Sequence, residues 1–202
     1  MSEIPILLLA AGTSSRMRGR DKLMEDVDGQ PLIARQARMA LAATEGAVLV
    51  ALPPAPHPRH EALGDLQVTR VPVPDAADGM AVSLRTGIGA LPEGTTAVMV
   101  LLADLPDLTV QDLKTVLATV ESQPEKTVWR GATEDGRPGH PIVFAAPWFP
   151  DLAALTGDEG GRSVVAAAGN DLALVPLPGQ HALADLDTPE AWAAWRAARD
   201  DG

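Results

Sequence analysis

IPILLLAAGTSSRMRGRDK, residues 4–22, is the stretch of the chain that decides the fold. Residues 4–10 are a continuous apolar run, which predicts a β-strand buried on both faces. Residues 12–15 are small or hydroxylated, so their backbone N–H groups could close on an anion. Residues 16–22 then carry four basic side chains against Asp21 alone. These features predict a polyphosphate cradle after the strand, with a solvated basic surface loop as the alternative.

Outward from this strand, short apolar runs alternate with segments of helical periodicity. Strand-like runs occupy residues 46–53, 67–73, 95–104 and 171–177, and helical patterns occupy residues 31–44, 79–91, 109–122 and 188–201. Apolar segments 126–132 and 140–146 flank a loop rich in glycine and charge, and the proline-rich residues 53–60 are interpreted as a stiff loop. This alternation predicts a three-layer α/β/α fold with a mostly parallel sheet, in a single domain over residues 1–202. In such sheets ligands bind beyond the carboxyl ends of the strands.

Composition narrows the class of function. The chain has 202 residues, of which 46% are hydrophobic and 3% aromatic, and its net charge is −11. An acidic chain with so few stacking residues argues against nucleic acid as a partner. No apolar run reaches the roughly 18 residues that a membrane span needs, and no basic residue precedes the first apolar run, which argues against a secretory signal. The sequence has no Cys, which excludes disulfides and thiolate metal sites and fits a cytoplasmic protein.

Carboxylates stand at two further places where a ligand could bind. Asp104 ends the clearest strand pattern, just before Pro106, and could hold a hard cation through its oxygen atoms. The alternative is a turn or cap residue. Asp187 stands where the last helix begins and could simply cap it, but Asp185 two residues earlier adds a second carboxylate on the same face of an extended segment.

Several well-known site patterns do not fit. The loop after the first strand matches neither the P-loop nor the dinucleotide-binding glycine pattern. No pair of His has the spacing of a zinc site, and no Ser has the partners of a hydrolase nucleophile. His140 stands between Gly139 and Pro141 in what reads as an exposed turn before a strand, and from the residues alone a structural role is favoured.

Three motifs in one order resemble a known family. LAAGTSSRM with a following Lys, then LLADLPDL and then DLDTPEAW form the pattern of the MobA-like nucleotidyltransferases, and the resemblance covers nearly the whole chain. RPGHPIVF at 137–144, GDEGGR at 157–162 and DGMAVSLRTGI at 78–88 resemble the molybdenum cofactor cytidylyltransferase branch. The resemblance implies the Rossmann-like fold of nucleotide-diphospho-sugar transferases. It implies Mg²⁺-dependent transfer of CMP from CTP to the phosphate of the molybdenum-pterin cofactor, with release of pyrophosphate and handover of the product to a molybdenum hydroxylase.

The resemblance also assigns roles to individual residues. The nucleotide would be bound by the first loop and by one later segment, comprising Leu9, Ala10, Ala11, Gly12, Thr13, Ser14, Ser15, Gly79, Met80, Ser83 and Asp104. Arg16, Lys22 and Asp104 would be catalytic. Asp104, Asp187 and Asp185 would supply metal ligands. The acceptor would be bound by Gly139, His140, Pro141, Asp158, Gly160 and Arg162.

The chain departs from the family pattern in one place. Family members have Met-Gly after the loop Arg and a Lys five residues after it, whereas here Arg18–Gly19 follows Met17 and Lys22 stands six residues after Arg16. One inserted residue shifts the register of the loop, so the roles of Arg18 and Gly19 stay open. A guanylyltransferase that uses GTP, a sugar-phosphate nucleotidyltransferase and a non-catalytic cofactor carrier are the alternatives.

Overall fold

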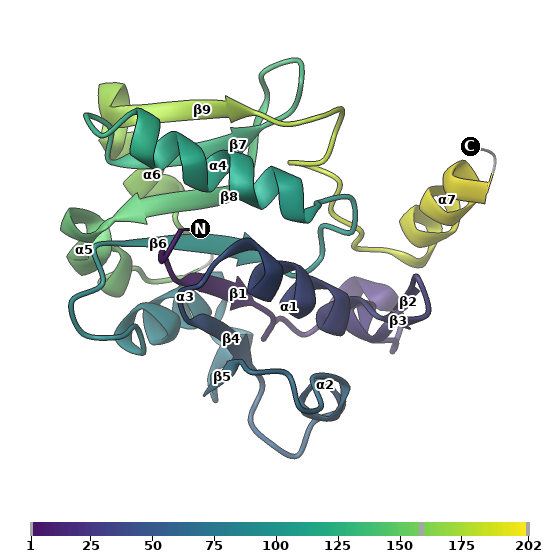
Figure 1. The fold of residues 1–202 in the computed structure, drawn as a ribbon. Helices are drawn as coiled ribbons and strands as arrows, with labels where there is room; N and C mark the ends of the chain where they lie inside the picture. The colour runs from purple at the N-terminus through teal and green to yellow at the C-terminus, as the bar shows by residue number, and fades with distance from the viewer. Residues whose placement is uncertain (1, 158–159, 201–202) are drawn as a thin grey trace.

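A seven-stranded sheet forms the centre of the molecule (Figure 1). The structure is a computed structural model that describes residues 2–157 and 160–200. The strand order is β5-β4-β1-β6-β8-β7-β9. Neighbouring strands are parallel except at β8, which runs antiparallel to both β6 and β7, so the predicted mostly parallel sheet is confirmed. The strands are β1 Ile6–Leu9, β4 Val48–Leu52, β5 Thr69–Pro72, β6 Ala97–Leu102, β7 Val128–Ala132, β8 Pro138–Ala145 and β9 Leu172–Pro176.

Helices cover both faces of the sheet. The α-helices are α1 Leu32–Ala43, α2 Pro58–Ala62, α3 Met80–Gly89, α4 Val110–Ser122, α5 Phe149–Ala153, α6 Arg162–Ala168 and α7 Pro189–Asp200. The short 3₁₀ helices are η1 Ser15–Met17, η2 Lys22–Met24, η3 Ala76–Asp78, η4 Ala146–Trp148 and η5 Gly169–Asp171. A small hairpin of β2 Asp26–Val27 and β3 Gln30–Pro31 precedes α1. Within the described residues no helix combines the length and apolarity that crossing a membrane requires.

The alternation of side chains along the strands creates two separate cores. In β1, Ile6 and Leu8 pack with apolar residues of α1 and α4 on one face, and Leu7 and Leu9 pack with α3, α5 and α6 on the other. All four residues of β1 and all five of β4 are buried, which explains their unbroken apolar sequence. Burying each such aliphatic side chain stabilises the fold by about 1.5–3 kcal/mol.

Local signals in the sequence set the helix ends. Thr109 and Asp112 form a capping box at α4, with Asp112 N donating to Thr109 Oγ1 at 3.2 Å and Thr109 N donating to Asp112 Oδ2 at 2.8 Å. Thr188 caps α7, since its Oγ1 accepts a hydrogen bond from Ala191 N at 3.2 Å. Thr188 therefore does the capping that the sequence also allowed for Asp187.

Two expectations about irregular segments are wrong. The proline-rich segment 53–60 is not a loop throughout, because α2 begins at Pro58, where a missing N–H costs nothing in the first turn. His140 does not stand in an exposed turn but within β8, partly buried. The helices α5 and α6 and the hairpin β2–β3 had no counterpart in the sequence prediction.

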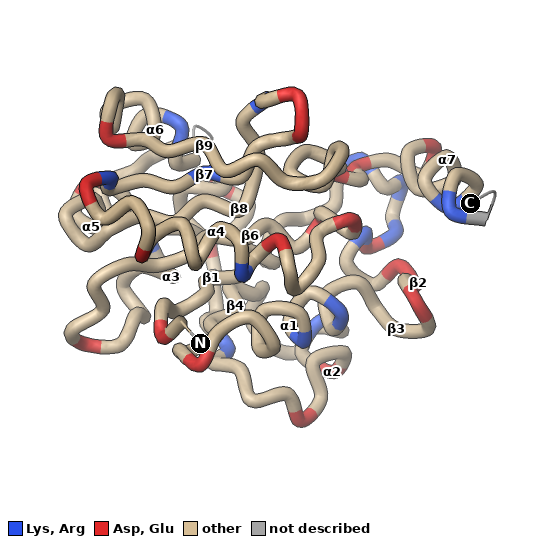
Figure 2. The backbone as a smooth tube through the Cα atoms, turned by 45° about the horizontal axis from the view of Figure 1, so that its top comes forward, with Lys and Arg blue, Asp and Glu red and all other residues tan. Residues whose placement is uncertain are grey.

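The last helix stands apart from the sheet beside the hairpin β2–β3 (Figure 1). Arg196 pairs with Glu25 and Arg199 with Asp28, each at 2.7 Å. The buried Trp192 packs edge-on against Trp195, as their spacing on one helix face predicts. The charge pattern is mixed: Lys and Arg lie interspersed with Asp and Glu along the chain (Figure 2).

Candidate active site

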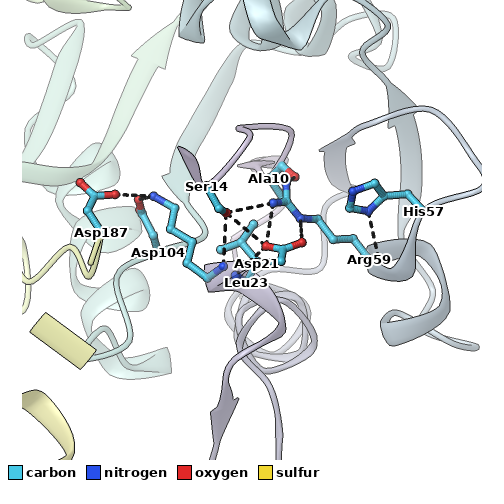
Figure 3. Close-up of polar contacts among 9 residues, drawn as sticks. Ala10, Ser14, Asp21, Leu23, His57, Arg59, Asp104 and Asp187 are labelled. Carbon is cyan, nitrogen blue, oxygen red and sulfur yellow. Dashed lines mark hydrogen bonds and ion pairs between the residues drawn. The ribbon is translucent and has the colours of Figure 1, made fainter. Parts of the chain in front are cut away.

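Three segments distant in sequence meet at the carboxyl edge of the sheet. The loop after β1 supplies Lys22, the end of β6 leads into Asp104, and the segment before α7 supplies Asp187. Lys22 Nζ donates to Asp104 Oδ2 at 2.5 Å and to Asp187 Oδ1 at 2.6 Å (Figure 3). Leu186 N donates to the backbone carbonyl of Asp104 at 3.2 Å, and this contact holds the segment before α7 against the end of β6.

Charge and burial in this cluster act in opposite directions on each group. Burial alone would lower the pKa of Lys22, but the two carboxylates raise that pKa above its ordinary value. Burial would raise the pKa of Asp187, yet Lys22 and Arg16 bring it below its ordinary value. The pKa of Asp185 is raised by burial and by the charges of Asp187 and Asp104. Lys22 therefore stays protonated while three carboxylates crowd around one small region.

In the basic loop, Lys22 and Arg20 have different partners. Lys22 reaches the carboxylates, whereas Arg20 pairs with Glu25 at 3.1 Å. Arg18 and Gly19 both have positive φ, 53° and 87°, so the extra residue is accommodated in a left-handed turn before Lys22. Arg16 pairs with Asp187 at 2.5 Å, which places its guanidinium at the same edge as Lys22.

The loop after β1 lines a cavity of about 370 Å³. Nine of the residues assigned to the nucleotide by the family resemblance line it, namely Leu9, Ala10, Ala11, Gly12, Thr13, Gly79, Met80, Ser83 and Asp104. Ser14 and Ser15 line an adjoining cavity of about 480 Å³. A Cβ placed on Gly12 would meet nothing within 4 Å, so a ligand can approach the backbone there.

A third cavity, of about 540 Å³, is also lined by Asp104. Arg16, Lys22, Asp104, Asp185 and Asp187 form one part of its lining. Residues expected to bind the acceptor form another part, namely Gly139, His140, Gly160 and Arg162. Lys22 and Asp104 belong to the lining of both the 370 Å³ and the 540 Å³ cavities. The two linings also share Leu9, Met80 and Leu102, so the cavities adjoin along five residues, of which Lys22 and Asp104 are the charged ones.

One expected acceptor residue among the described residues, Pro141, does not line this cavity. Pro141 is buried in β8 on the face opposite His140 and Ile142, which do line the cavity. Asp158 lies outside the described residues. Gly139 has a packing reason to be glycine, because a Cβ there would collide with the backbone of Ala182, whose carbonyl accepts from His140 N at 2.9 Å.

His140 and Arg130 form part of the wall of the 540 Å³ cavity. Burial and the nearby charge of Arg130 lower the pKa of His140 to about 4, so the ring is neutral near pH 7. Its Nδ1 is buried, with no hydrogen-bond partner among the described residues. Arg130, which sequence reasoning missed, projects from β7 and donates from Nε to the Gly139 carbonyl at 2.9 Å. Burial and the charge of Arg162 lower the pKa of Arg130.

A second missed group is the pair of Arg59 and Asp21. Arg59 lies on α2, and only 2% of its side chain is exposed. Its Nε and Nη2 each donate to Asp21 at 2.7 Å, and its Nη1 donates to the Ala10 carbonyl at 2.6 Å (Figure 3). The basic residue was overlooked because it follows four prolines in a stretch that reads as a solvated loop.

The donor set at Asp104 suits a hard cation in part. Asp104 Oδ1 is buried and makes no hydrogen bond to any described residue, while Oδ2 is taken by Lys22. The described residues contain no group of three or more side chains arranged to hold a metal ion by themselves. Mg²⁺ commonly binds through one or two carboxylates together with substrate phosphates, so the protein residues could complete a site only with substrate present.

Comparison with known proteins places this arrangement in context. The purine catabolism protein PucB of Bacillus subtilis (strain 168) is 29% identical over 203 residues, with 92% of each chain covered. The structure of Rv0371c from Mycobacterium tuberculosis H37Rv superposes with a TM-score of 0.79 at 24% identity, covering 96% of this chain and 98% of that one. Its manganese complex gives 0.78 at 22%, covering 96% and 97%. CMP:2-keto-3-deoxy-manno-octonic acid synthetase complexed with CTP gives 0.75 at 14%, covering 98% and 99%.

The structural neighbours share the nucleotidyltransferase fold, with helices on both faces of a mostly parallel sheet. The MobA-like NTP transferase domain matches residues 6–173, from β1 into the start of β9, and so includes the loop with Lys22, Asp104 and the strand β8 with His140. Over that span the chain belongs to the MobA-like NTP transferase family and is a nucleotidyltransferase.

Proposed function

We propose that this protein transfers CMP from CTP to the phosphate of the molybdenum-pterin cofactor and releases pyrophosphate. The observation that carries the proposal is the position of Lys22 Nζ, 2.5 Å from Asp104 and 2.6 Å from Asp187, where the two cavities meet. A nucleotide in the 370 Å³ cavity and an acceptor in the 540 Å³ cavity would face each other across this cluster.

The reaction needs no covalent protein nucleophile. An oxygen of the acceptor phosphate forms a bond to the α-phosphorus of the triphosphate. The bond from the α-phosphorus to the oxygen that bridges to the β-phosphorus breaks, and that oxygen leaves with the electron pair as part of pyrophosphate. Catalysis then consists of positioning two anions and stabilising the charge on the leaving group.

Named groups can supply each of these effects. Backbone N–H groups of residues 11–15 would bind phosphate oxygens. Arg16 and Lys22 would balance the charge of the departing pyrophosphate, the first as a planar fork and the second as a point charge. Triphosphate binding would draw Lys22 and Arg16 from their present carboxylate partners towards phosphate oxygens, freeing Asp104 and Asp187 as oxygen ligands.

Asp104 and Asp187 would hold Mg²⁺, and Asp185 beside them is a further candidate ligand. When bound, Mg²⁺ supplies charge neutralisation at phosphate oxygens. The unpartnered Asp104 Oδ1 and the raised pKa of Asp185 support a cation here, because both indicate negative charge with too few donors. The manganese complex of Rv0371c is further support for a divalent ion on this fold.

The acceptor side would recognise the cofactor through cations. Arg130 and Arg162 line the 540 Å³ cavity and can meet an anionic group, and Gly160 lines the same cavity next to Met80. Neutral His140 would contact the acceptor without exchanging a proton. CTP as the donor rests on the family resemblance and is supported by CTP binding in the synthetase of the same fold. Handover to a molybdenum hydroxylase is part of the same proposal.

A pyrophosphate assay tests the proposal. The purified protein is incubated with Mg²⁺ and the molybdenum-pterin cofactor, and CTP, GTP, ATP and UTP are offered separately. Release with CTP alone supports the proposal, and release with GTP alone assigns the protein to guanylyl transfer by the same residues. In a second set of reactions a sugar phosphate is offered in place of the cofactor, and release only there would assign the sugar phosphate as the acceptor. No pyrophosphate release from folded protein with any nucleotide favours a different acceptor or a cofactor carrier.

A further inference from the structure

We infer that Arg59 and Asp21 are a positioning pair that holds the triphosphate loop in its binding shape and masks a negative charge beside it. The inference rests on the proposed nucleotidyl transfer, because it assigns the loop 12–22 to a triphosphate. The family resemblance assigns no role to either residue: Asp21 stands within the first motif, directly before Lys22, and Arg59 comes from α2, which follows β4 in the chain.

Arg59 makes contacts that only a guanidinium can make together. Its Nε and Nη2 grip the two oxygens of Asp21 side by side, each at 2.7 Å, while Nη1 donates to the Ala10 carbonyl at 2.6 Å (Figure 3). This planar fork joins the beginning of the loop, at the end of β1, to its end, just before Lys22. A Lys would supply one point charge and could not bridge both ends.

Asp21 also accepts hydrogen bonds from two other residues of the loop, Ser14 and Leu23. Its Oδ1 accepts from Leu23 N at 3.0 Å, which begins η2, and from Ser14 Oγ at 3.2 Å. Ser14 Oγ in turn accepts from Lys22 N at 3.2 Å. Ser14 adopts a left-handed conformation, with φ 53° and ψ 34°, which a non-glycine residue keeps only where its surroundings enforce it. The backbone of Lys22 is thereby fixed while its Nζ reaches Asp104.

Arg59 also neutralises the negative charge of Asp21 beside the loop. Asp21 lines the 480 Å³ cavity together with Gly12, Thr13 and Arg59, so its carboxylate faces the space beside the phosphate loop. Burial alone would raise the pKa of Asp21, but the hydrogen bonds and charge of Arg59 bring it below the ordinary value, so it stays ionised. An ionised Asp21 without Arg59 would repel a triphosphate.

The proline-rich segment serves as the support for Arg59. Pro58 occupies the first turn of α2, His57 Nδ1 accepts from Arg59 N at 3.3 Å, and His60 Nε2 lies 2.8 Å from the Pro53 carbonyl. These contacts fix the short helix so that one side chain points inward. A buried ion pair is on average a weak source of stability, which favours a role in the site over a role in folding alone.

The test compares Arg59→Met with Arg59→Lys, Asp21→Asn and the double variant Arg59→Met/Asp21→Asn. Arg70→Met is the matched control, since Arg70 is an exposed arginine of β5 whose Nη2 binds the Gly64 carbonyl. Inorganic tripolyphosphate and CTP are titrated calorimetrically, the KM and kcat of turnover are measured for both substrates, and amide exchange is followed over residues 12–23.

Arg59→Met should weaken tripolyphosphate and CTP binding by about tenfold or more, because it leaves a buried charge unpaired beside the ligand. The KM for the acceptor should change less than about twofold, since Arg59 does not line the 540 Å³ cavity. Adding Asp21→Asn should restore part of the lost affinity, which a purely structural loss would not allow. Arg59→Lys should keep the fold and show an intermediate loss, and Arg70→Met should match the wild type.

The inference is overturned if Arg59→Met and Arg59→Lys bind tripolyphosphate like the wild type, or if Asp21→Asn deepens the loss in the double variant. Amide exchange separates this outcome from failure of the proposed function. If the wild type binds no triphosphate, the proposed function is wrong, but the positioning role still requires faster exchange at residues 12–23 in both Arg59 variants. Unchanged exchange there would remove the positioning role by itself.

Discussion

At the scale of single residues, the candidate site is built around one cation, Lys22, that lies between the carboxylates of Asp104 and Asp187. Lys22 is 15% exposed, and each of its partners Asp104 and Asp187 is 16% exposed. Such a partly buried network loses much of its hydration energy and recovers it only in part through its own contacts. We interpret the cluster as a site held ready for phosphate, where the charges exchange partners when substrate binds.

Asp104→Asn tests this interpretation. The substitution removes one negative charge but keeps the shape of the side chain, so the fold should persist while turnover falls by roughly 10²–10³. Circular dichroism and pyrophosphate release are measured together. Asp171→Asn is the control, because Asp171 is exposed at the opposite edge of the sheet, before β9. Normal turnover in Asp104→Asn would exclude Asp104 from the site.

Lys22→Ala tests the register of the loop. Removing the ammonium should weaken CTP binding by about tenfold or more, whereas Arg20→Ala should leave it nearly unchanged, because Arg20 pairs with Glu25 away from the carboxylates. Calorimetric titration with CTP distinguishes them. If Arg20→Ala caused the larger loss, the assignment of Lys22 to the phosphates would be wrong.

His140 gives the stability of the protein a defined pH dependence. The pKa of His140 is lowered to about 4 in the folded state, whereas an unperturbed His has a pKa of about 6.5. Between about pH 6.5 and 4, the imidazole is therefore protonated in the unfolded chain and neutral in the folded protein. Stability should therefore fall on acidification through this window, by up to about 2 kcal/mol at pH 5. The cavity lined by His140 is also lined by the charged residues Arg130, Arg162, Asp104 and Asp185.

Urea unfolding of the wild type and of His140→Gln at pH 7 and pH 5 measures this effect. The wild type should lose more stability than the variant, since only the wild type carries the imidazole. Equal losses in the two proteins would show that His140 does not titrate in this window.

At the scale of secondary structure elements, glycine in β8 controls how closely the acceptor segment packs. Gly139→Ala should destabilise the fold by about 1–3 kcal/mol, because the new Cβ collides with the Ala182 backbone. Gly89→Ala is the control, since a Cβ at the end of α3 meets nothing within 4 Å. Thermal unfolding of both variants tests this prediction, and equal midpoints would mean that the Ala182 segment moves aside freely.

The elements divide into those that sequence could predict and those that it could not. The strands β1, β4 and β6 carry unbroken apolar runs, and the capping box of α4 is entirely local, so both are visible in the sequence. The short helix α2 is not, because its prolines and charges resemble a loop and its only buried charge, Arg59, finds its partner Asp21 far along the chain.

The candidate site divides in the same way. Lys22 was assigned from the basic run of residues 16–22 and the family pattern, and Asp104 from its place at the end of a buried strand. Arg130 could not be found, since it is one polar residue within the strand β7, and only the sheet order brings it near His140. Pro141 was assigned to the acceptor with its neighbours, yet alternation along β8 turns it to the other face.

At the scale of the whole molecule, two cavities of about 370 and 540 Å³ share the Lys22–Asp104 pair. The chain carries a net charge of −11, so a triphosphate must be held by the local cations of the loop against the charge of the molecule as a whole. This arrangement suits a reaction in which two anionic substrates meet at a cluster where Lys22 and Arg16 can exchange carboxylate partners for phosphate oxygens.

Tracking the α-phosphate tests the central claim most directly. The protein is incubated with Mg²⁺, the molybdenum-pterin cofactor and CTP labelled at the α-phosphorus, and the label is followed alongside pyrophosphate. Nucleotidyl transfer predicts that the label moves to the cofactor in step with pyrophosphate release. The Asp104→Asn variant should lose both the label transfer and the pyrophosphate release. Label that stays in CTP, or that appears as free CMP, would contradict nucleotidyl transfer to this acceptor.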